Sequence, residues 1–162
     1  MHRHPINRRT CAAWLGLLGM VPVRAAARPP VHIALARDAP PGIDPVGYLV
    51  SEKYDGVRAV WDGQSLRFRS GLPLAAPSWF LGRLPAEPLD GELWLGRGRF
   101  DTLSGTVRRE VPDDDAWHRL RYMVFELPGA PGDFSARAQR IEQLARDAAW
   151  PQLAAAPQRV VQ

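Results

Sequence analysis

The chain has 162 residues, of which 46% are hydrophobic and 23% charged, a length that suits one domain and a composition that excludes disorder throughout. The formal net charge is +4, but residues 1–27 hold four arginines and no acidic residue, which leaves 17 basic and 17 acidic side chains in the remainder. The net charge therefore gives no reason to expect nucleic-acid binding. Cys11, the only cysteine, also lies in this segment, so the remainder has no thiol for a disulfide, a metal site or a nucleophile.

The first 27 residues have the layout of a secretory signal peptide. Arg3, Arg8 and Arg9 precede an apolar run at residues 11–23, and small residues follow at 25–27. The run is shorter than the about 20 residues that span a bilayer. We expect export to the periplasm by the Sec or the twin-arginine route, with no stable membrane insertion after cleavage. A buried helix or a membrane anchor is the alternative.

The predicted elements begin after an irregular lead-in at residues 28–46, which is rich in Pro, Ala and Gly. Residues 48–50 are expected to form a short buried strand. Residues 57–61 and 66–69 alternate apolar and polar side chains, and Asp62-Gly63 between them predicts a hairpin turn.

The middle of the chain predicts a helix and a second hairpin. Residues 77–84 are expected to form a short helix with Pro in its first turn. Residues 89–95 read as a strand that turns at residues 96–98 and returns through Arg99-Phe100. Residues 101–109 are expected to form a loop or a short helix.

The last third predicts a buried strand and a long helix. Asp113–Asp115 indicates a helix start or a turn rather than a metal cluster, and residues 120–127 are nearly all apolar, as in a buried strand. Ser135 is expected to cap a helix that ends before Pro151. Its apolar face would comprise Ala138, Ile141, Leu144, Ala145 and Ala148. Residues 151–162 are expected to be a frayed tail.

Lys53 is the only lysine of the chain and lies in Ser51-Glu52-Lys53-Tyr54-Asp55-Gly56-Val57-Arg58. Arginine cannot lose its proton in a protein, whereas lysine can, and the neutral amine is a nucleophile. Lys53 is therefore a candidate for covalent chemistry, with a solvated surface lysine as the plain alternative. Gly56 is expected to shape this loop by adopting a positive φ.

Four segments then follow a known order of motifs. Residues 53–58 match the Lys-x-Asp-Gly-x-Arg signature of covalent nucleotidyltransferases. Arg69-Ser70-Gly71 resembles the arginine motif that follows this signature, and Asp90-Gly91-Glu92-Leu93 resembles the third motif. Residues 122–127 resemble the aromatic strand that comes after the third motif. Only the first motif is specific alone. In sequence, over residues 46–144, they resemble the ATP-dependent DNA ligases, and most of all the small exported bacterial kind.

The resemblance implies an α+β fold of antiparallel β-hairpins with a few helices, an ATP-grasp-like adenylation domain at residues 47–150. Two further ligase motifs, a Glu-Gly strand and a Lys-x-Lys pair, are not found after residue 141, nor is the small β-barrel (OB) domain. We therefore expect a partial domain, a monomer, that adenylates weakly and does not seal nicks by itself. The family's role would be in DNA repair, recombination and replication.

The resemblance also implies a mechanism. A neutral Lys53 would attack the α-phosphate of ATP to give lysyl-AMP, with Mg²⁺ offsetting the phosphate charge. The AMP would pass to the 5′-phosphate at a nick in duplex DNA, and the 3′-hydroxyl would displace it. A nearby Arg58 and the bound cation would disfavour the ammonium form of the lysine.

The same resemblance assigns the nucleotide contacts. Arg58 and Arg69 would contact ribose or phosphate oxygens, and Glu92 would accept a hydrogen bond from a ribose hydroxyl. Phe125 would stack on adenine. The backbone of Ser51-Glu52 would read the edge of the base.

Two other function classes remain open. One is a related RNA ligase or capping enzyme, which would share the first motif. The other is a non-catalytic exported domain that binds nucleotide or DNA and never labels its lysine. Six arginines could contact the DNA backbone, or they could be scattered, solvated surface side chains: Arg97, Arg99, Arg108, Arg109, Arg119 and Arg121.

Overall fold

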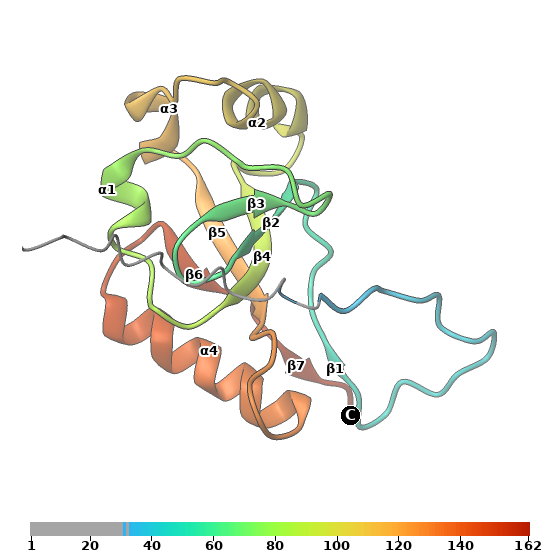
Figure 1. Ribbon diagram of the computed structural model, residues 1–162. Helices are drawn as coiled ribbons and strands as arrows, with labels where there is room; N and C mark the ends of the chain where they lie inside the picture. The colour runs from blue at the N-terminus through green and yellow to red at the C-terminus, as the bar shows by residue number, and fades with distance from the viewer. Residues whose placement is uncertain (1–30, 32) are drawn as a thin grey trace, which may run out of the picture.

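The computed structural model describes residue 31 and residues 33–162, so the predicted signal peptide lies outside the described residues. A five-stranded sheet with the order β3-β2-β4-β5-β6 forms the centre of the molecule (Figure 1). Neighbouring strands are antiparallel except β5 and β6, which are parallel and joined through a helix. The strands are β2 (Val57–Trp61), β3 (Leu66–Phe68), β4 (Leu89–Trp94), β5 (Arg121–Glu126) and β6 (Leu153–Ala155). The predicted α+β class is confirmed.

Helices α2 (Phe100–Val107) and α4 (Phe134–Ala148) pack against different strands of this sheet and share one hydrophobic core with it. Helix α4 packs against β5 and β6, while α2 packs against β2 and β4. In the view of Figure 1, α4 lies at the bottom and α2 at the top, with α3 (Asp114–His118) beside α2 and α1 (Ser78–Leu81) at the left. No helix in the described part is long and apolar enough to cross a bilayer.

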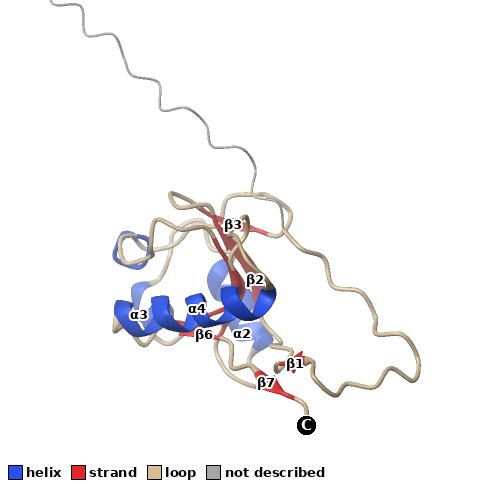
Figure 2. Ribbon diagram, turned by 90° about the horizontal axis from the view of Figure 1, so that it is seen from below, coloured by secondary structure: helices blue, strands red, loops and turns tan. Residues whose placement is uncertain are grey.

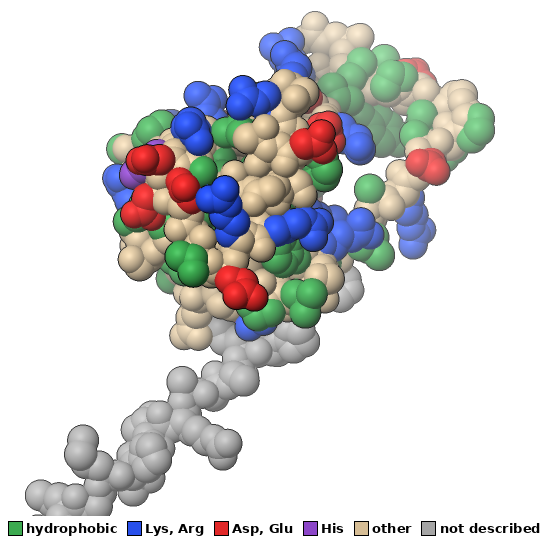
Figure 3. Space-filling model, turned by 90° about the horizontal axis from the view of Figure 1, so that it is seen from above, with side chains coloured by type: hydrophobic (Ala, Val, Ile, Leu, Met, Phe, Trp, Pro, Cys, Tyr) green, Lys and Arg blue, Asp and Glu red, His purple; other side chains and the backbone are tan. Residues whose placement is uncertain are grey.

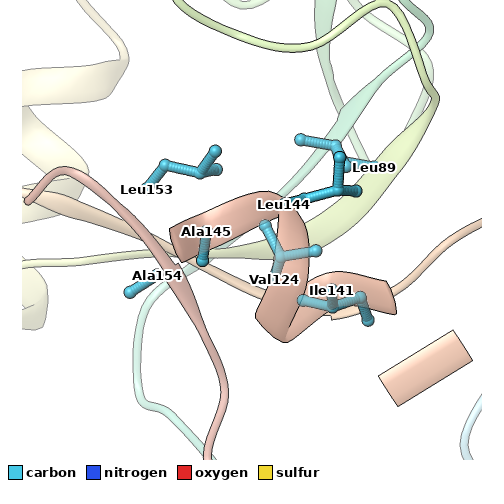
Figure 4. A pocket seen from close by; sticks show the side chains of 7 residues that line it. All are labelled: Leu89, Val124, Ile141, Leu144, Ala145, Leu153 and Ala154. Carbon is cyan, nitrogen blue, oxygen red and sulfur yellow. The ribbon is translucent and has the colours of Figure 1, made fainter. Parts of the chain in front are cut away.

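The core joins the sheet to these helices through large apolar side chains. Phe80 on α1 contacts Trp117 on α3 and Trp150, with ring centroids 4.9 and 5.0 Å apart. The face of α4 meets the sheet in a tight apolar contact that leaves no room for a water molecule (Figure 4). That contact is formed by Leu89, Val124, Ile141, Leu144, Ala145, Leu153 and Ala154. The predicted apolar face of this helix is therefore the one that the sheet buries.

Two predictions about helix starts have different outcomes. Asp113 caps α3 as expected, because its Oδ1 accepts a hydrogen bond from the amide of Ala116 at 2.8 Å. Helix α4 is capped by Asp133 and not by Ser135, since the Oδ1 of Asp133 accepts from the amide of Ala136 at 2.8 Å. Both are strong N-cap residues, and only the backbone path decides between them.

The predicted return strand at Arg99-Phe100 is wrong. Phe100 is the first residue of α2, which takes up the segment 101–109 that was expected to be a loop or short helix. The turn at residues 96–98 therefore connects a strand to a helix. Residues 77–84 do contain a helix, but α1 occupies only four of them.

The first and the last strand of the described chain meet in a separate sheet. Strand β1 (Leu49–Val50) pairs in antiparallel fashion with β7 (Arg159–Val160), away from the main sheet (Figure 2). Val50 is exposed, so the expected burial of this strand is wrong. The expected frayed tail is also wrong, because Leu153 is 4% exposed in β6. Strands this short carry little sequence pattern, and pairing with distant strands specifies them.

Candidate active site

Six of the seven predicted site residues line one pocket. Its volume is about 300 Å³, and its lining residues are Glu52, Lys53, Tyr54, Arg58, Arg69, Glu92 and Phe125. Ser51, the seventh, is exposed and is not among them.

The described part of the lead-in, residue 31 and residues 33–46, forms neither helix nor strand.

The order of the strands explains why these residues meet. Arg58 on β2 and Glu92 on β4 are directly paired, and Glu92 is in turn paired with Met123 on β5. Directly paired residues lie on the same face of a sheet, so the side chains of Arg58 and Glu92 project together. Lys53 reaches the pocket from the loop between β1 and β2.

A β-bulge places Phe125 in the pocket. The pairing of β4 with β5 steps from Gly91↔Val124 to Asp90↔Glu126, which leaves Phe125 without a partner in the ladder. Bulges of this kind bend a strand and turn a side chain toward a site. The ring of Phe125 lies 5.4 Å from the guanidinium carbon of Arg58, a cation–π contact within the pocket.

Arg58 is held in place by Asp90, which lies entirely inside the protein. Its Nε donates to Oδ1 at 2.9 Å, and its Nη2 donates to Oδ2 at 2.6 Å and to the carbonyl oxygen of Ala34 at 2.7 Å. The hydrogen bond with Asp90 raises the pKa of Arg58 above its already high ordinary value, so the guanidinium stays charged. Its predicted contact with ribose or phosphate oxygens stays a prediction.

Asp90 is a residue of this site to which the sequence alone assigned no role. The motif Asp90-Gly91-Glu92 was recognised, but only Glu92 was given a role. A signal was present, because an aspartate directly after Leu89 in a strand that reads as buried needs a partner for its charge. The sequence does not say which arginine supplies it.

Glu92 has an unusual protonation equilibrium. Partial burial raises the pKa of its carboxyl from 4.5 to about 7, although the nearby charge of Arg58 acts in the opposite direction. At neutral pH both the protonated and the ionised forms are therefore populated. The protonated form can donate a hydrogen bond and the ionised form can only accept one.

Gly56 serves the site through its small size. It is not among the glycines with positive φ, so the prediction of that backbone conformation is wrong. A side chain at this position would collide with the carbonyl oxygen of Leu93 and with the Cγ of Glu92. The loop that carries Lys53 can approach β4 only because residue 56 has no Cβ.

A second, shallower groove continues from the pocket. Its volume is about 540 Å³, and it shares Arg58, Arg69 and Glu92 with the pocket. Beyond them it is lined by Gly56, Val57, Phe68, Ser70, Leu72, Phe100 and Arg108. The guanidinium of Arg108 lies 6.0 Å from the ring of Phe68, a cation–π contact within the groove.

Two arginines of the predicted cluster form ion pairs with acidic side chains. Figure 3 shows blue basic side chains over the side that carries α2 and α3, with red acidic groups between them. Arg97 pairs with Glu52, and Arg109 pairs with Asp113. Among the described residues no group of three or more His, Cys, Asp or Glu side chains could hold a metal ion.

Comparison with known proteins adds a sequence relative. No family model matches the chain. A curated DNA ligase from Haemophilus influenzae is 35% identical over 96 residues, which cover 59% of this chain and 35% of that protein.

Solved structures show the same likeness in three dimensions. One match is a solved structure of a Lig E DNA ligase, from a study of DNA binding with a minimal scaffold. It has a TM-score of 0.70 and 34% sequence identity, and the match covers 75% of this chain and 48% of that chain. Pmar-Lig_PreS3 matches with a TM-score of 0.54 at 15% identity, which shows the fold alone. The chain thus spans 35% and 48% of the lengths of the two more similar relatives. Over the matched part, the chain resembles DNA ligases in both sequence and fold.

Proposed function

We propose that this domain transfers AMP from ATP to Lys53, the first step of joining DNA ends. The observation that carries the proposal is that Lys53, Arg58, Glu92 and Phe125, which come from four separate segments, line one pocket. Such a pocket brings a nucleophile, a fixed cation, a polar acceptor and an aromatic ring to one small molecule.

The chemistry is a displacement at phosphorus. The neutral Nζ of Lys53 attacks the α-phosphorus of ATP, a P–N bond forms, and the bond from that phosphorus to the bridging oxygen breaks. Pyrophosphate leaves and the amine proton passes to solvent. An oxygen of the 5′-phosphate at a nick then attacks the same phosphorus, the P–N bond breaks, and the amine of Lys53 regains a proton. The adjacent 3′-hydroxyl attacks the phosphorus of the 5′-phosphate, AMP leaves, and the hydroxyl proton passes to solvent.

The pocket residues suit ATP as the substrate. Phe125 offers a ring on which adenine can stack, and Arg69 is an exposed cation beside the pocket for the phosphates. Glu92 would bind a ribose hydroxyl as acceptor or donor, since its pKa lies near 7. The backbone of Ser51-Glu52 would read the base. Arg58 would contact the nucleotide in the orientation that Asp90 sets.

A divalent cation such as Mg²⁺ would accompany the triphosphate. The described residues form no carboxylate cage, so the phosphates and water would be its main ligands, as is usual for Mg²⁺ in nucleotide sites. Bound there, it would offset phosphate charge during the transfer.

Duplex DNA is the proposed second substrate, and the groove beside the pocket is where we place its end. The groove shares Arg69 with the pocket and adds Arg108, so phosphates of a strand would meet fixed cations along it. Exposed Leu72 and Phe100 would contact sugars or bases. A fall in DNA affinity with rising salt, steeper for the unaltered chain than for Arg108→Gln, would support this placement. Equal slopes would contradict it.

Transfer of radiolabel from [α-³²P]ATP to the protein, with Mg²⁺, tests the main proposal. We expect a covalent adduct on the unaltered chain and none on Lys53→Arg. The double variant Lys53→Arg/Arg146→Lys is the matched control, because it keeps one lysine but moves it to α4. Labelling of either variant would overturn the assignment of the nucleophile. If the unaltered chain binds ATP but forms no adduct, the protein would be a non-catalytic binding domain. If it is labelled from GTP and not from ATP, it would be a capping-type enzyme.

We also propose that residues 1–27 direct export to the periplasm and that the rest is a monomer. The support is the arrangement of basic, apolar and small residues in that segment. Cell fractionation with and without the segment, followed by sedimentation of the exported form, tests both. Retention of the full chain in the cytoplasm would contradict the first, and a stable dimer the second.

A further inference from the structure

Both sequence neighbours of Lys53 contact the same short stretch of chain, residues 94–97. The carboxylate of Glu52 accepts two hydrogen bonds from Arg97, from Nε at 2.9 Å and from Nη2 at 2.7 Å. On the other side of Lys53, the ring of Tyr54 meets that of Trp94 edge to face, with centroids 5.2 Å apart. The nucleophile is thus held from two sides.

The stretch that carries both anchors is part of the sheet. Trp94 is the last residue of β4, the central strand that also carries Glu92, and Arg97 follows three residues later. The loop reaches back toward Glu52 through Gly96 and Gly98, whose φ values of +127° and +68° are rarely adopted by other residues. Residues 51–55, by contrast, belong to no strand or helix, so side-chain contacts must fix their path.

We propose that Arg97 and Trp94 are positioning residues, which aim Lys53 into the pocket and orient the backbone of Glu52 that would read the base. The inference rests on the proposed adenylyl transfer. Arg97 has a second effect, because Glu52 lines the pocket and its negative charge would disfavour a polyanionic nucleotide there. A bidentate guanidinium offsets that charge and turns the carboxylate toward the loop.

The exposure of this pair predicts what kind of effect it has. The side chain of Arg97 is 81% exposed and that of Glu52 is 38% exposed, so the pair contributes little to global stability. Its loss would instead allow more conformations to the Lys53 loop, which lowers the fraction of molecules ready to react. A change in rate without a change in melting temperature is therefore the expected signature.

Single-turnover formation of lysyl-AMP at saturating ATP provides the test. We expect Arg97→Gln to react about fivefold more slowly, with an unchanged melting temperature and a weaker preference for ATP over GTP. Arg97→Lys, which keeps the charge, should recover part of the rate, and Trp94→Phe should lose less than Trp94→Ala. Arg146→Gln is the matched control, since Arg146 is also exposed and paired, with Glu142 and Gln143 on α4. Equal rates for Arg97→Gln and Arg146→Gln would overturn the inference.

Amide hydrogen exchange in residues 51–56 separates this inference from the proposed function. It needs no ATP, and we expect faster exchange there in Arg97→Gln than in the unaltered chain or Arg146→Gln. An absent adduct with faster exchange would reject adenylyl transfer and keep the anchoring of the loop. Unchanged exchange would reject the anchoring, whatever the labelling shows.

Discussion

Arg58 on β2 is paired with Glu92 on β4 in the strand register, yet its guanidinium donates to Asp90, which lies two residues before Glu92 on β4. The bidentate contact fixes the plane of the guanidinium beside Phe125. Glu92 is thereby left beside the cation without a direct hydrogen bond to it, and burial raises its pKa to about 7. One buried aspartate thus sets the orientation of the arginine and affects the protonation of the neighbouring glutamate.

Removing Asp90 should destabilise the fold. In Asp90→Ala the charge of Arg58 loses its partner in a largely buried position, and the free energy of unfolding should fall by about 3 kcal/mol. Urea unfolding followed by tryptophan fluorescence measures this. Glu87→Gln is the control, because the exposed pair of Glu87 with Arg140 should contribute about 1 kcal/mol or less. Equal losses in the two variants would mean that burial of the pair has no special importance.

Glu92 should make stability depend on pH between 4.5 and about 7. Its folded-state pKa is raised, so the protonated carboxyl is favoured in the fold, and this contribution is complete below the unfolded-state pKa and is lost as pH rises through 7. With allowance for partial exposure, the loss should be about 1 to 2 kcal/mol. Unfolding free energies at pH 5 and pH 8 measure it. Glu92→Gln should flatten this part of the profile, and an unchanged slope in that variant would assign the effect to another group.

Phe125 should contribute to nucleotide affinity. Phe125→Ala should raise the Kd for ATP by a factor that corresponds to about 1 to 3 kcal/mol, the usual range for a base stacked on an aromatic ring. Phe125→Tyr keeps the ring and should bind nearly as the unaltered chain does. Isothermal titration calorimetry measures the affinity. Phe134→Ala removes a partly exposed ring from α4 and controls for general effects of the substitution. A Kd unaffected by Phe125→Ala would rule out stacking.

The last strands should matter for stability. Leu153→Ala removes a side chain that is 4% exposed between β5 and α4, and should cost about 3 kcal/mol. Val160→Ala, at an exposed position of β7, should change stability by no more than about 0.5 kcal/mol. Thermal unfolding of both variants compares them. A neutral Leu153→Ala would show that this segment is frayed in solution.

Local patterns in the sequence predicted much of the frame. Alternation around Asp62-Gly63 predicted the β2–β3 hairpin, and the spacing of Ala138 and Ile141 predicted the buried face of α4. The single lysine and the motif around it pointed to the pocket. These predictions succeed because hairpins, amphipathic faces and contiguous motifs depend on residues that are close together in the chain.

The tertiary structure decided what depends on distant residues. Asp90 acquires Arg58 as its partner only when β2 and β4 pair, and Phe125 turns into the pocket only because a bulge shifts the register of β5 on β4. The parallel strand β6 and the pairing of β1 with β7 also join segments far apart in the chain. The residues of a short strand, or a single buried charge, do not indicate which distant residue will be the partner, because the partner becomes a neighbour only when the chain folds.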